Sequence, residues 1–313
     1  MKIVNPLYDK AFKYLMENER IAKKVLSVIL DQEVMELTVG QQETIVPDEK
    51  RNFTLFRLDF VAVIKEKDGS RKKVLIELQK SKYPTDILRF RTYLGMNYAK
   101  ADKVIKTGTR TVKETYPIIT IYILGYNLDD LPYMAVTVNR RVINSVNKKP
   151  VKVKSFFIEQ LTHRSHIIQV LRLPEKRRTK LEKFLTLFNQ AWITEDRYIL
   201  DLRDVPKEFE DVAKYLEGAA MDETFRRQLE AEEEIDNLFD EQEEKFLKQI
   251  EKLKQRERDA KQREEEERRQ KEEERKKVIL IIKNLVKTGM SLEDVSKITK
   301  KSIEEIKEIV NGS

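Results

Sequence analysis

The strongest constraint on the fold is a stretch of 15 residues, 263–277, that contains no apolar side chain. Such a segment has nothing to bury, so it cannot contribute to a hydrophobic core. It does contain acid-before-base pairs at i, i+4 spacing, such as Glu264 with Arg268, which stabilise a solvated helix. We therefore expect a solvent-exposed helical spacer between a large N-terminal part of the chain and a small C-terminal part.

The charge is distributed unevenly along the chain. Residues 1–216 carry 40 Lys and Arg against 28 Asp and Glu, whereas residues 217–277 carry 16 against 22. The formal net charge of +7 therefore combines a strongly basic first part with an acidic arm. A basic surplus favours a polyanionic partner such as DNA, although a basic domain without such a partner also fits the charge alone.

The composition excludes several classes of site. The chain has no Cys, which excludes disulfides, thiolate metal sites and cysteine nucleophiles, and its two His make a multi-histidine metal site improbable. We interpret the two, His163 and His166, as a polar loop pair. The longest apolar runs have five residues, whereas a membrane span needs about 20. We expect a cytoplasmic protein with no membrane segment.

Hydrophobic periodicity predicts an α/β domain over residues 1–216. Helical spacing occurs over residues 8–31, 85–104, 174–192 and 206–216. Strand patterns occur over residues 33–46, 53–64, 73–79, 116–125, 134–138 and 151–158. Asp68-Gly69 between the second and third of these strands is a hairpin signal. We expect a mixed sheet with helices on both faces.

The acidic arm, residues 217–277, retains a thin apolar seam in its first half. The residues of the seam are Phe239, Phe246, Ile250, Leu253 and Ala260. Their spacing predicts roughly three heptads of coiled coil, or of a helix packed on the domain.

Residues 278–313 resemble a helix-turn-helix of three short helices. Ser291 with Asp294, and Ser302 with Glu305, fit the capping box that begins a helix. The last helix is acidic and would repel phosphate, so we favour oligomerisation or docking over DNA reading for this module.

Three polar residues in the predicted hairpin carry the chemistry. Asp59 lies in an apolar run, and Glu77 and Gln79 lie two residues apart in the next strand, where they share one face. An acid in an apolar strand is costly to bury unless it is paired or bound to a metal. Carboxylate and amide oxygens suit Mg²⁺ or Mn²⁺. Pairing of each acid with a nearby Arg or Lys is the alternative.

This arrangement resembles the PD-(D/E)xK nuclease superfamily, in its recombination-promoting nuclease and putative transposase branch. The resemblance is carried by Asp59, the triplet Glu77-Leu78-Gln79, the run from Asn5 to Leu15 and the helix after the triplet. It implies a restriction-endonuclease-like fold, with Asp59 and Glu77 as metal ligands and Gln79 where most of the superfamily has the catalytic lysine. It also implies a catalytic part for Asp9, whose alternative is a charge at the start of a helix. Lys80 would take part only if the strand ends there, because alternation otherwise places it on the opposite face. Lys13, Lys82, Arg89 and Arg91 are the expected phosphate contacts.

We therefore predict a Mg²⁺-dependent DNA endonuclease that acts in recombination or transposition. The alternative is a catalytically inactive DNA-binding or assembly protein that keeps the nuclease fold. A homodimer through the arm or the C-terminal module would bring two sites together, as cutting both strands requires.

Overall fold

The computed structural model describes residues 1–40, 43–46, 54–57, 60–81, 86–107 and 110–312. The chain forms two compact units, Met1–Leu238 and Phe239–Ser313. The first unit is a mixed α/β domain, and the second is helical.

The first unit is built on a six-stranded mixed sheet. Strands β6, β9 and β11 run parallel to one another, and the outer pairings are antiparallel. The strand order is β10 (Ala135–Val138), β11 (Arg164–Gln169), β9 (Ile118–Leu124), β6 (Arg71–Gln79), β5 (Phe60–Lys65) and β2 (Glu36–Val39). The expected mixed sheet and the β5–β6 hairpin around Gly69 are thereby confirmed.

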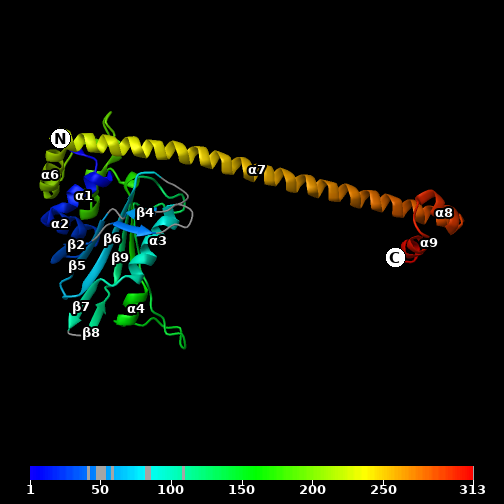
Figure 1. The fold of residues 1–313 in the computed structure, drawn as a ribbon, viewed down its shortest axis with the longest axis horizontal. Helices are drawn as coiled ribbons and strands as arrows, with labels where there is room; N and C mark the ends of the chain where they lie inside the picture. Colours follow the sequence, from blue (N-terminus) through cyan, green and yellow to red (C-terminus); the bar gives the residue numbers. More distant parts are fainter. Residues whose placement is uncertain (41–42, 47–53, 58–59, 82–85, 108–109, 313) are drawn as a thin grey trace. The chain divides into compact units, whose positions relative to one another are not determined.

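Helices cover both faces of this sheet (Figure 1). The larger core lies on the face of α1 (Asp9–Glu17), α2 (Glu19–Ile29), α5 (Lys180–Leu185) and α6 (Glu210–Met221). Alternation along β6 sends Ile76 and Leu78 into this core and Leu75 into a smaller one, where it packs with Tyr93 of α3 (Asp86–Ala99). The residues of β6 that share a face with Leu75 therefore lie on the α3 side.

The structure corrects three predicted elements. The helix expected over residues 8–31 is two helices, because the side chain of Asn18 accepts a hydrogen bond from the Ile21 N–H and begins α2. The strand expected over 53–64 is two strands, since β4 (Thr54–Arg57) pairs with β3 (Glu43–Val46) in a separate sheet. Residues 151–158 are not a strand, because Ser155 caps α4 (Phe156–Leu161).

Other elements were missed or overextended. The interpretation of His166 as a loop residue is wrong, because it lies in β11, which pairs with both β9 and β10. A second hairpin joins β7 (Lys103–Thr107) to β8 (Arg110–Glu114), and β1 (Lys2–Val4) pairs with β12 (Ile199–Asp201). The helix expected over 174–192 shrinks to α5 followed by two short 3₁₀ turns.

The spacer is part of one long helix, α7 (Glu223–Lys287). Its first residues, 223–238, belong to the first unit, where Leu229 is fully buried in the core. In the part of the chain that the structure describes, no helix is long and apolar enough to cross a membrane.

The second unit ends in three helical segments that share a small core. The end of α7 packs with α8 (Leu292–Thr299) and α9 (Ile303–Asn311) around Ile282, Val295 and Ile306. Ser302 and Glu305 form the expected capping box. Ser291 caps the Asp294 N–H as expected, but the Asp294 carboxylate accepts from the Ser291 hydroxyl instead of the backbone.

Candidate functional site

Strand β6 places the two triplet residues on the α3 face of the sheet. Glu77 is 2% exposed and Gln79 is 9% exposed. Glu77 lies opposite Tyr122 of β9, and Gln79 lies opposite Leu124. Burial first, and the charge of Glu77 after it, raise the pKa of Tyr122. A central strand thus fixes both triplet residues in a largely buried environment.

The amide of Gln79 is held in one orientation. The hydroxyl of Tyr126 donates to Gln79 Oε1 at 2.8 Å. Because the carbonyl oxygen is directed at Tyr126, the amide nitrogen, which is a donor, is directed elsewhere. Gln79, Phe90, Tyr122 and Tyr126 contribute to the lining of a cavity of about 390 Å³ on this face. The amide therefore stands at the wall of a space large enough for a small group.

Asp59, the first predicted metal ligand, lies outside the described residues, as does Lys82. The register beside Asp59 is defined: Phe60, which follows it in the chain, pairs with Ile76, which precedes Glu77. Of the other predicted phosphate contacts, Arg91 lies exposed on α3. The side chain of Arg89 lies outside the described part of the structure.

Asp9, Lys13 and Lys80 gather on the α1 side of the sheet. Lys80 follows Gln79 and extends to the opposite side, where its Nζ lies 3.6 Å from the centroid of the Tyr8 ring. Asp9 begins α1, and its Oδ2 is 2.5 Å from Lys13 Nζ. The sequence prediction thus divides into a pair on the α3 face, Glu77 with Gln79, and a cluster on the α1 face.

Three acids of α7 that sequence reasoning missed complete the α1-side cluster. Lys80 forms ion pairs with Asp236 and with Glu232, the latter at 3.8 Å. Glu233 contributes, after burial, to raising the pKa of Tyr8. Only the acidic composition of the arm hinted at these contacts, because nothing in the sequence indicates which turn of a long charged helix returns to the domain.

The donor chemistry on β6 fits a hard divalent cation. Glu77 supplies a carboxylate and Gln79 an amide oxygen, and Asp59 would add a second carboxylate. Among the described residues, no group of three or more Asp, Glu or His side chains is placed to hold a metal. The described residues therefore do not make up a complete metal site on this face, and Asp59 is the further ligand predicted from the sequence.

Comparison of the chain with protein families, curated proteins and solved structures finds no match.

Proposed function

We propose that the chain is a Mg²⁺-dependent endodeoxyribonuclease. The observation that carries the proposal is the burial of Glu77, with Gln79 beside it on one face of a central strand. The neighbouring strand contributes Phe60, the residue directly after Asp59, opposite Ile76. Directly opposed residues on antiparallel strands place their side chains on the same face. The sequence neighbours of Asp59 and Glu77 therefore meet in register, which supports these two acids as joint metal ligands.

In this proposal each residue has one role. Asp59 and Glu77 hold the cation, which would polarise the scissile phosphate and lower the pKa of a bound water. Gln79 cannot act as a base, so its amide positions the attacking water, and Tyr126 fixes that amide through the bond to Oε1. Residues 1–216, with their surplus of Lys and Arg, bind the DNA backbone in a salt-dependent manner with little sequence preference.

Cleavage of supercoiled plasmid tests the assignment. We expect nicking with Mg²⁺ or Mn²⁺, none with EDTA, and activity at background level for Asp59→Asn and Glu77→Gln. Glu175→Gln is the matched control, because Glu175 is exposed and lies outside the strands of the sheet. Circular dichroism and a gel-shift assay establish that each variant folds and binds DNA. Undiminished cleavage by Glu77→Gln contradicts the proposal.

The second candidate is the catalytically inactive DNA-binding or assembly protein. The observation that favours it is the engagement of Lys80 by Glu232 and Asp236, which leaves this lysine away from the triplet face. Metal-independent DNA binding by the wild type without any cleavage would select this alternative. A role in recombination or transposition rests on the family resemblance and applies to the nuclease only.

Self-association through α7 is part of the proposal. Leu253, which belongs to the apolar seam of this helix, is 62% exposed and lies in the second unit. Apolar side chains spaced along a charged helix are typical of a coiled-coil seam. We expect light scattering to show a dimer, and Leu253→Glu to shift it to monomer. A wild-type monomer at micromolar concentration would contradict a dimer built on this seam.

A further inference from the structure

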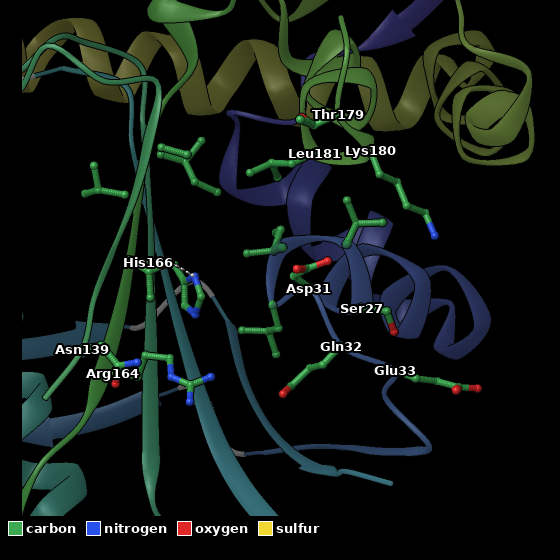
Figure 2. Close-up of a pocket in the computed structure, with 17 residues that line it drawn as sticks. Ser27, Asp31, Gln32, Glu33, Asn139, Arg164, His166, Thr179, Lys180 and Leu181 are labelled. Carbon is green, nitrogen blue, oxygen red and sulfur yellow. Dashed lines mark hydrogen bonds between the residues drawn. The ribbon is translucent and has the colours of Figure 1, made fainter. Parts of the chain in front are cut away.

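A large cavity lies on the opposite side of the sheet from Glu77 and Gln79. It has a volume of about 1010 Å³ and is bounded by β10 and β11, the end of α2 and the start of α5 (Figure 2). Ile168 in its wall belongs to the core between the sheet and α1 and α2, whereas the triplet faces α3. The cavity is therefore separate from the candidate nuclease site.

His166 places an unsatisfied nitrogen at this cavity. The residue is 8% exposed, and its Nδ1 lies 3.2 Å from Oγ1 of Thr137, its partner across the β10–β11 pairing. Its Nε2 is buried and has no hydrogen-bond partner among the described residues. In Figure 2 the imidazole lies on the cavity side of β11. A buried polar atom without a partner is destabilising, and a hydrogen bond to a bound group would remove that cost.

Arg164 supplies positive charge next to His166 in the cavity wall. It lies two residues before His166 on β11 and lines the cavity beside Asn139 (Figure 2). Burial first, and the Arg164 charge second, lower the pKa of His166 to about 4. Arg164 forms no ion pair with any residue that the structure describes. A guanidinium without an ion-pair partner among the described residues, next to a neutral imidazole and an amide, is suited to the oxygens of a carboxylate or phosphate.

The rest of the wall limits the shape and charge of an occupant. Apolar residues line much of the cavity, among them Ile29, Leu30 and Leu181. The carboxylate of Asp31 lies on the facing wall, and Glu33 and Lys180 complete the charged lining on the helical side (Figure 2). Asp31 would repel a second anionic group, so a single anionic head group on an apolar body is the best match.

We propose that this cavity binds a small organic anion, with its single carboxylate or phosphate group held by Arg164 and His166 and its apolar body against α2. Benzoate and phenyl phosphate, which present a carboxylate and a phosphate on the same apolar ring, test the two head groups. Inorganic phosphate tests whether the apolar body is needed.

The chain contains only two histidines, so imidazole NMR signals report the site directly. His163 is a built-in reference, because its Nδ1 pairs with the Tyr98 hydroxyl at 2.9 Å and it does not line the cavity. His163→Gln assigns the signals. We expect phenyl phosphate or benzoate to shift the His166 signals saturably, to raise the pH at which His166 titrates, and to leave His163 unchanged.

Variants separate specific binding from general charge effects. Arg164→Gln should weaken binding of both aromatic anions at least tenfold, whereas Arg141→Gln, at an exposed arginine after β10, should leave it unchanged. Glu77→Gln should bind them as the wild type does, which keeps this test independent of the nuclease proposal. Unmoved His166 signals at millimolar concentrations of both anions, or equal shifts in Arg164→Gln, would overturn the proposal. Inorganic phosphate binding as tightly as phenyl phosphate would overturn the part assigned to the apolar wall.

Discussion

The carboxylate of Glu232 caps the helix that begins at Asp9, 223 residues earlier in the chain. Its Oε1 accepts from the Asp9 N–H at 2.7 Å, and its Oε2 accepts from the Lys10 N–H at 3.1 Å. The free N–H groups of a first helical turn and the helix dipole both favour an anionic acceptor. The first part of α7 is thereby joined to the domain that carries the candidate site.

Removing this cap should destabilise the first unit. We expect Glu232→Ala to lower the free energy of unfolding by about 1–2 kcal/mol, because two N–H groups lose their acceptor and Lys80 loses one of its two acids. Urea denaturation followed by circular dichroism measures the loss. Glu234→Ala, on an exposed position of the same helix, should change stability by less than about 0.5 kcal/mol. Equal effects of the two substitutions would contradict a cap by Glu232.

A buried ion pair on the α3 face should be sensitive to the loss of one partner. Lys73 Nζ lies 2.7 Å from Asp102 Oδ1, with side chains 8% and 4% exposed, and the other Asp102 oxygen accepts from the Tyr116 N–H. We expect Lys73→Met to cost about 3–5 kcal/mol, because it leaves an uncompensated buried carboxylate.

The matched control is the exposed pair Lys67 and Glu33, where Lys67→Met should have little effect on stability because both side chains are solvated. Adding Asp102→Asn to Lys73→Met should restore part of the lost stability, since the unpaired charge is removed. Denaturation midpoints of the four proteins give the comparison. A Lys73→Met variant as stable as the control would show that the pair is solvated.

Protonation of His166 should weaken the fold in mild acid. Its folded pKa of about 4 lies below the ordinary 6.5, so the folded state disfavours the proton. Stability is therefore fully present above pH 6.5 and falls as the pH drops from 6.5 towards 4. Since one pKa unit corresponds to 1.36 kcal/mol, the loss by pH 4.5 is about 2 kcal/mol after allowance for partial solvation.

His166→Gln should flatten this part of the pH profile, and His163→Gln should alter it less. Thermal unfolding between pH 4.5 and 7.5 provides the measurement. If His166→Gln and the wild type lose the same stability between pH 7.5 and 4.5, the loss is due to other titratable groups.

The small core of the second unit should depend on a single buried isoleucine. Ile306 is fully buried with Ile282 and Val295, so Ile306→Ala should unfold α8 and α9 locally. Limited proteolysis should then cut within residues 288–312 at low protease, with the first unit intact. Ile298→Ala, at a side chain that is 59% exposed, is the control. Equal resistance of both variants would indicate that α8 and α9 are held by other contacts.

The sequence alone determined the features that depend on local pattern. The apolar strand patterns around residues 60–64 and 118–124, the turn at Gly69, the Ser302 cap and the solvated stretch 263–277 all follow from residue type and spacing. So does the shared face of Glu77 and Gln79, because side chains alternate along any strand.

Tertiary structure decided which distant segments meet. Three contacts join residues whose local sequence does not indicate the partner. They are Glu232 with the start of α1, Lys80 with Asp236, and His166 with Thr137 across β10 and β11. These contacts form because the sheet and its helices bury their apolar faces, and the polar groups near those faces are then brought together. The apolar-free stretch 263–277 showed from the sequence where a core could not form. Only the folded chain showed that the acidic arm begins by capping the domain that precedes it.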